Sequence, residues 1–178
     1  MSRKLLFLFL ITSVSLALVT ACGNKSKKPM DDAQVMHDSQ DMLTQIIIYD
    51  VFTPPVSSRI YVYSSLAAYE AIRYAKPENA SLTARLRGFK PMPEPEKNKN
   101  YNFTLAATKA FFTVVHKVVF SLDSLKHFEE TTFNDFKDHM DADTYQRSVA
   151  FGEAVGKAVL ERANACLLYT SPSPRDRG

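Results

Sequence analysis

The sequence predicts an all-α protein whose helices pack as a bundle. Apolar residues recur at helical spacing through nearly all of residues 34–165, which is the pattern of amphipathic helices. The one short run that could form a strand, residues 46–48, is followed by no alternating partner. No repeat of fixed period appears, so a repeat architecture is not expected.

Residues 1–21 have the features of a bacterial lipoprotein signal peptide. Arg3 and Lys4 supply the positive start, and the apolar run that follows is too short for a spanning helix, which needs roughly 20 residues. The residues V-T-A-C at positions 19–22 match a lipobox, in which small side chains precede the acylated cysteine. We therefore expect Cys22 to carry the lipid, because two or more acyl chains anchor a protein stably. A plain secretory signal with a chance cysteine is the alternative.

Residues 22–33 are predicted to form a polar tether between the lipid and the folded part. With Cys22 acylated, the protein is expected in the cell envelope, facing the periplasm or the cell exterior. The membrane is then its partner through the lipid anchor.

The first two helices are predicted over residues 34–49 and 56–74. Apolar residues share one side of the first helix: Val35, Met42, Ile46 and Tyr49. Pro54 and Pro55 separate the two helices, because proline interrupts a helix and suits the first turn of the next one. The second helix has so little polar surface that we expect it to be central.

Two charged residues stand on this otherwise apolar second helix, Arg59 and Glu70. A buried charge is costly unless it is paired and hydrogen-bonded. We therefore predict that both make structural ion pairs, and a role in ligand binding is the alternative.

Residues 76–100 contain four prolines and are predicted to form a surface loop with a short helical turn near residues 82–86. Residues 102–120 return to a helical pattern. One apolar stripe runs along this helix: Ala107, Phe111, Val114, Val118 and Leu122. Because its valines lower the helix propensity, burial must stabilise it.

The next helix is predicted to be capped by Asp123 or Ser124. Its inward residues are Leu125, Phe128, Phe136 and Met140, and its outward residues are Glu129, Lys137 and Asp138. Asp141 or Asp143 is expected to cap the last helix. That helix has an apolar row: Tyr145, Val149, Gly152, Val155 and Val159. Gly152 and Gly156 allow a neighbouring backbone to approach closely.

Residues 166–178 do not continue the helical pattern. The run C-L-L-Y-T-S-P-S-P-R-D at positions 166–176 resembles a translated sequencing-library adapter, a transposase end followed by a read primer. Such segments are set aside when a fold is predicted. We therefore expect this sequence to match the natural one only as far as about Ala165, and the natural protein to continue beyond that residue. The alternative is that residues 166–178 are a natural proline-rich tail.

Charge and cysteine content exclude several classes of function. Without Arg3, Lys4, Arg175 and Arg177, 18 of the 22 basic residues remain, and without Asp176, 18 of the 19 acidic residues remain. This neutral balance argues against nucleic-acid binding. Both cysteines fall outside the predicted fold, which leaves no disulfide framework, zinc site or cysteine nucleophile to expect.

The histidines do not form a recognisable site. Asp135 and His139 have the i, i+4 spacing of metal ligands on a helix, but the surrounding charges favour a solvated face. His116 lies beside the valine stripe and is predicted to be a core or boundary residue. His37 and His127 have no nucleophile or metal ligand at a characteristic spacing in the sequence. We expect no catalytic, cofactor-binding or metal-binding residue in this sequence.

One segment resembles a known family. The run D-x-F-x-P-P-x-x-S-R-I-Y-x-Y-x-x-x-A-A-Y-E-A over residues 50–71 is similar to the N-terminal region of vanadium-dependent haloperoxidases, which belong with the type 2 phosphatidic acid phosphatases. Residues 150–160 resemble a second helix of that family. The resemblance implies that residues 34–165 are a partial haloperoxidase-like domain, the N-terminal half of a larger helical one.

The pocket motifs of that family are absent from this sequence. The family holds vanadate or a phosphate ester with K-x6-R-P, P-S-G-H and S-R-x5-H, in which the cations neutralise the oxyanion and the histidines do the chemistry. Neither of the first two motifs occurs here, and Ser58-Arg59 begins the third but has Ser65 where histidine is required. No catalytic residue is therefore carried over, and vanadate is expected only in the intact protein.

The leading hypothesis is an exported lipoprotein that, when intact, oxidises halide with peroxide or hydrolyses phosphate esters. The sequence in hand would be an inactive part of it that lacks the C-terminal half of its domain. The alternative is a complete helical lipoprotein that serves as an interaction or binding module in the cell envelope.

Overall fold

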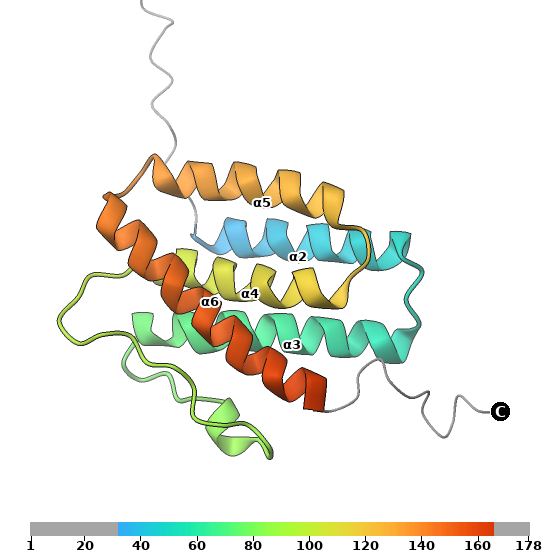
Figure 1. Ribbon diagram of the computed structural model, residues 1–178, viewed down its shortest axis with the longest axis horizontal. Coiled ribbons are helices and arrows are strands. Elements are labelled where there is room, and N and C mark those ends of the chain that lie inside the picture. The colour runs from blue at the N-terminus through green and yellow to red at the C-terminus, as the bar shows by residue number, and fades with distance from the viewer. Residues whose placement is uncertain (1–31, 166–178) are drawn as a thin grey trace, which may run out of the picture. The chain divides into compact units, whose positions relative to one another are not determined.

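The computed structural model describes residues 32–165, which form α-helices and two short 3₁₀ helices without a β-strand in that range (Figure 1). The all-α prediction is confirmed. The elements are α2 (Asp32–Tyr49), α3 (Pro54–Ile72), η1 (Arg73–Ala75), η2 (Thr83–Arg85), α4 (Phe103–Val118), α5 (Leu122–Lys137) and α6 (Ala142–Ala165). The predicted signal peptide, Cys22 and the adapter-like tail lie outside the described residues.

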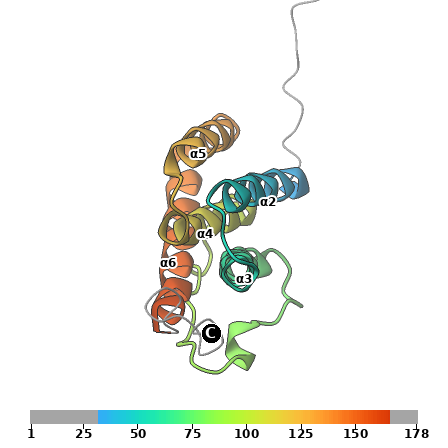
Figure 2. The same ribbon diagram turned by 90° about the vertical axis from the view of Figure 1, so that its right-hand side faces the viewer.

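The central helix is α4, not α3 as the sequence had suggested. Helix α4 packs against α2, α3, α5 and α6, and Figure 2 shows it between them. Eleven of its 16 residues are buried, including Phe112 and four of the five predicted stripe residues, Ala107, Phe111, Val114 and Val118. The fifth, Leu122, begins α5 and is half-buried. Helix α3 packs mainly against α4 and α6, and it keeps an exposed side on which Val62 is 60% exposed.

Helices α4 and α6 cross at very short distance, and two glycines permit this. A Cβ atom on Gly152 would lie 2.2 Å from the backbone oxygen of Ala106, and one on Gly156 would lie 2.6 Å from the Cβ of Thr113. Any larger side chain at these positions would push the helices apart. The predicted close approach at these glycines is confirmed.

Most helix boundaries follow local signals. Pro54 and Pro55 occupy the first turn of α3, where a missing N–H has no consequence. The Asn102 side chain accepts a hydrogen bond from the Leu105 N–H at 2.8 Å and caps α4. Asp141 caps α6 by accepting from the Thr144 N–H at 2.9 Å, as predicted. These hydrogen bonds from Thr144 hold the pKa of Asp141 below its ordinary value.

The predicted apolar side of α2 is only partly buried, and the predicted cap of α5 is wrong. Ile46 is buried and Val35 and Met42 are half-buried, but Tyr49 is 78% exposed. The buried residues of α2 are Ser39, Leu43, Ile46 and Ile47. Helix α5 begins at Leu122, one residue before the first predicted cap, Asp123. It begins there because the residue before it, Ser121, is held by a side chain from another part of the chain.

The loop between α3 and α4 runs over the surface, as predicted, and contains η2 at the expected turn. Rings from both ends of this loop pack against α6: the centroids of Tyr74 and Phe151 are 5.7 Å apart, and so are those of Tyr101 and Phe151.

None of the helices in residues 32–165 has the length and apolar character needed to cross a membrane.

Candidate functional site

Asp50 opens the run that resembles the haloperoxidases, and its carboxylate fastens the loop between α4 and α5. The backbone N–H of Phe120 donates to Oδ2 at 2.8 Å, that of Ser121 donates to the same oxygen at 3.2 Å, and the Ser121 hydroxyl donates to Oδ1. Both oxygens are therefore engaged with a loop about 70 positions later in the sequence. This explains why α5 begins without a cap of its own.

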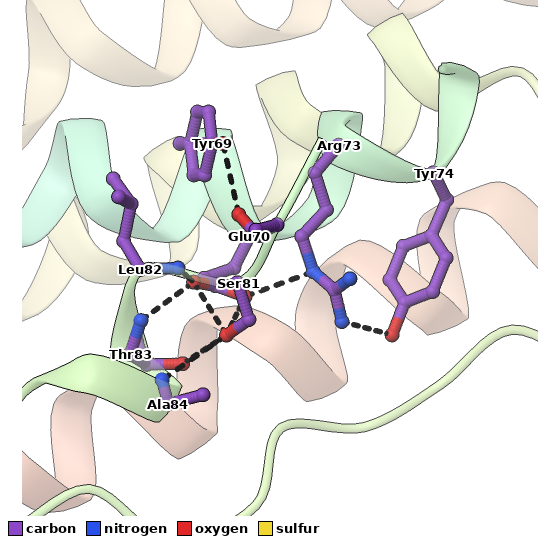
Figure 3. A network of polar contacts seen from close by, with 9 residues as sticks. Tyr69, Glu70, Arg73, Tyr74, Ser81, Leu82, Thr83 and Ala84 are labelled. Carbon is purple, nitrogen blue, oxygen red and sulfur yellow. Dashed lines mark hydrogen bonds and ion pairs between the residues drawn. The ribbon is translucent and has the colours of Figure 1, made fainter. Parts of the chain in front are cut away.

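Glu70 lies near the end of the same run and fastens a second loop (Figure 3). Its side chain is fully buried, and its Oε1 accepts from the backbone N–H groups of Leu82 at 2.7 Å and Thr83 at 2.8 Å. The Ser81 hydroxyl contacts both oxygens, and Arg73 Nε donates to Oε2 at 3.0 Å. The predicted structural ion pair of Glu70 is confirmed.

Arg73 extends this network to the neighbouring tyrosine. Its Nη2 donates to the Tyr74 hydroxyl at 2.5 Å, as Figure 3 shows. Burial raises the pKa of Tyr74 above its ordinary value, and the positive charge of Arg73 offsets this shift only in part. Glu70 is paired with Arg73 and hydrogen-bonded to the loop, and Arg73 is bonded to Glu70 and Tyr74, so this network stabilises the fold.

Arg59 does not make the predicted ion pair: it is exposed, and no carboxylate within residues 32–165 pairs with it. It lines a groove of 320 Å³ between α3, the loop after η2 and the end of α6. We call this the arginine groove, because Arg59, Arg87 and Arg162 line it together with apolar side chains. Guanidinium groups of this kind bind carboxylates and phosphates.

A charged cluster that sequence reasoning missed joins α5 to α4. Glu129 of α5 contacts Lys109 Nζ at 3.1 Å and the Nε2 of His116, both on α4. The prediction that Glu129 faces water is wrong, because its side chain is only 16% exposed. Lys109 and His116 are seven positions apart, so the sequence places them on one face of α4. That spacing does not reveal that their partner is Glu129 of α5.

The electrostatics of this cluster favour an ionised carboxylate. Burial alone would raise the pKa of Glu129, but the hydrogen bond with His116 and the charge of Lys109 outweigh it and lower the pKa. The cluster therefore holds α5 in place through charge.

The remaining histidines of residues 32–165 do not form a catalytic or metal-binding cluster. His37 and His127 are exposed, and His139 Nδ1 lies 2.7 Å from the backbone oxygen of Asp135 and 3.8 Å from its carboxylate. No three histidine, cysteine, aspartate or glutamate side chains in residues 32–165 are close enough together to hold a metal ion.

No family model matches this sequence, and no curated protein matches it either. A solved structure does match, described as the crystal structure of the first bacterial vanadium-dependent iodoperoxidase. The likeness has a TM-score of 0.72 at 28% sequence identity, and it covers 84% of this chain and 37% of that one. This chain shares its fold with part of a larger vanadium-dependent peroxidase. It spans little more than a third of the iodoperoxidase's length.

The residues described in this chain do not fit vanadate. The arginine groove offers cations for an oxyanion, but no histidine lines it, and a histidine is what the resemblance requires at the metal. Asp50 and Glu70, the acidic residues of the resembling run, are both engaged with loop backbone. Both acids therefore hold loops against the helices.

Proposed function

We propose that the intact protein is a vanadium-dependent peroxidase that oxidises a halide with hydrogen peroxide, and that residues 32–165 are part of its scaffold. The observation that carries this proposal is the fold likeness to a bacterial iodoperoxidase, at 28% identity over 84% of this chain. The run over residues 50–71 also supports it, because it resembles the same family. Phosphate-ester hydrolysis is the related activity, and the assay must distinguish it from halide oxidation.

Contacts within the described residues support a scaffold role. Asp50 and Glu70 hold two loops against the helices, and the glycines of α6 bring it close to α4. These contacts hold the helices together as a layer on which further helices of a larger domain could pack. The histidines and cations of the reaction would come from the rest of the intact protein.

The test is to extend the gene past Ala165 from an independent source and assay both forms. We expect the extended protein to contain P-S-G-H and to oxidise iodide with peroxide in a vanadate-dependent manner, followed by the absorbance of triiodide. The present chain should give no turnover above background with iodide, or with a phosphate ester. Turnover by the present chain would overturn the scaffold assignment. A stop codon within a few residues of Ala165 would favour the alternative of a complete interaction module.

We also propose that the protein is held in the cell envelope by a lipid on Cys22, which the lipobox at positions 19–22 supports. Metabolic labelling with a radioactive fatty acid should label the protein, and Cys22→Ser should abolish the label and move the protein out of the membrane fraction. Equal labelling of the Cys22→Ser variant would contradict the anchor. Cys166→Ser is the matched control, because that cysteine belongs to no lipobox.

A further inference from the structure

The arginine groove has a chemistry that nothing in residues 32–165 explains. It brings three guanidinium groups from three separate elements, α3, the loop after η2 and α6, to the margin of an apolar surface. We propose that it is the docking site for an acidic amphipathic helix from the part of the intact protein that follows Ala165. This inference rests on the proposed function, because it requires the chain to continue.

Charge is the first argument. No carboxylate in the described part of the chain pairs with Arg59, Arg87 or Arg162, and the nearby Glu161 is engaged with Lys90 at 2.8 Å. The segment between signal peptide and tail is neutral overall, so this positive charge is local to the groove. A partner with two or three carboxylates would satisfy the guanidinium groups in planar, bidentate pairs.

Apolar exposure is the second argument. Val62 is 60% exposed and Leu86 is 49% exposed, although Leu66 beside them is buried. Arg59, Val62 and Leu66 lie three and four residues apart, so they form one row along α3. A helix that lies along this row would place apolar residues on Val62 and Leu86 and acidic residues toward the arginines, which is the helix-in-groove mode of recognition.

The third argument is the size of the related protein. The iodoperoxidase is matched over only 37% of its chain, so most of that protein lies outside the match. A scaffold of this kind has a larger helical remainder to cover it. An internal helix is therefore favoured as the occupant over a separate molecule.

The experiment measures the accessibility of α3 inside the groove. Val62→Cys is introduced into the present chain, with Cys22→Ser and Cys166→Ser, and into the extended protein, and the alkylation rate of the new thiol is followed. We expect the thiol to react at least about tenfold more slowly in the extended protein, because docking must open before it is exposed. Equal rates in the two proteins would overturn the proposal.

Charge-reversal variants test whether the arginines themselves bind the docked helix. Arg59→Glu with Arg87→Glu in the extended protein should restore rapid alkylation of Val62→Cys. Arg85→Glu is the matched control, since Arg85 is exposed two positions from Arg87 but does not line the groove. Continued protection in the double variant, with a native circular dichroism spectrum, would overturn the proposal. Protection of the present chain that grows with its concentration would do so too, because the occupant would be a second copy.

The outcomes also keep this inference apart from the proposed function. An extended protein that oxidises iodide while Val62→Cys stays reactive would overturn the docking site alone. Protection of the thiol in an extended protein without peroxidase activity would overturn the enzyme and support the docking site. A reading frame that closes shortly after Ala165 would remove the occupant and overturn the docking site together with the enzyme.

Discussion

Glu70 is a fully buried carboxylate on which the loop after α3 depends. Glu70→Ala would leave Arg73 without its partner and the N–H groups of Leu82 and Thr83 without an acceptor. We expect the free energy of unfolding to fall by about 3–5 kcal/mol, as for other broken buried pairs, measured by urea denaturation. Glu78→Ala, at an exposed position of the same loop, is the control and should change it by less than about 0.5 kcal/mol. Equal stability of the two variants would show that the network contributes nothing.

Val51 adopts a left-handed backbone conformation, with φ of 55°, at the end of α2. Its N–H donates to the oxygen of Ile48 and the N–H of Phe52 donates to that of Ile47, the pattern of a helix end that glycine usually completes. A β-branched side chain is strained there. Val51→Gly should therefore raise the free energy of unfolding by about 1 kcal/mol, measured by urea denaturation.

The control for that substitution is Val62→Gly. Val62 is also an exposed valine, but it lies inside α3. Glycine should lower stability there by about 0.5 kcal/mol, because it is a poorer helix former than valine. A loss of stability at both positions would argue against relief of strain at Val51.

At the scale of elements, the attachment of α5 to α4 should depend on pH. The pKa of Glu129 is lowered from 4.5 in the folded protein, so its pairing stabilises the fold fully above that value. The contribution is lost as the pH falls through the lowered folded pKa. We expect amide hydrogen exchange in α5 to accelerate below about pH 4.5 before the rest of the bundle opens. Glu129→Gln should exchange rapidly in α5 already at neutral pH, and a variant with unchanged exchange would contradict the role of the cluster.

The crossing of α4 and α6 should be intolerant of a single methyl group at Gly152. Its added Cβ would lie 2.2 Å from the Ala106 oxygen, a backbone atom that cannot turn aside. Gly152→Ala should lower the free energy of unfolding by about 3 kcal/mol, at the upper end of overpacking effects, measured by thermal denaturation. Ala150→Gly, on the exposed side of the same helix, should cost about 1 kcal/mol. A stable Gly152→Ala variant would mean that the helices can separate at little cost.

Elements were predictable where their signals are local. Two prolines start α3, Asn102 and Asp141 start α4 and α6, and the glycine pair of α6 indicated its crossing. Predictions failed where the deciding partner comes from elsewhere in the chain. Asp50 binds the residue before α5 in place of a local cap, and Lys109 of α4 pairs with Glu129 of α5. Neither contact can be predicted from the residues next to α5 in the sequence.

At the scale of the whole molecule, the candidate site was the least predictable feature. Arg59 stands out as a charge in an apolar stretch of sequence, but Arg87 and Arg162 belong to a loop and another helix, and only the fold brings the three together. The expected ion pair of Arg59 rested on the assumption that α3 is buried on all sides. That assumption failed because α4 has the greater apolar surface and takes the centre of the bundle.

Exposed apolar residues near the end of α2 should make the present chain self-associate. Tyr49, Val51 and Phe120 are 73–83% exposed there, and the ring of Phe120 lies 5.0 Å from that of Phe52. We expect concentration-dependent association in sedimentation, and Tyr49→Ser with Phe120→Ser should reduce it. Thr131→Ser, an exposed polar position on α5, is the control. A monodisperse sample with one cooperative thermal transition would instead identify a self-sufficient domain.

The two acids that mark the ends of the resembling run, Asp50 and Glu70, both direct their oxygens to loop backbone. Their presence in a sequence therefore reports on architecture. A genome survey that used this run as its query would therefore gather proteins by scaffold. Assigning activity in such a survey requires the histidine-bearing motifs to be found in the same open reading frame.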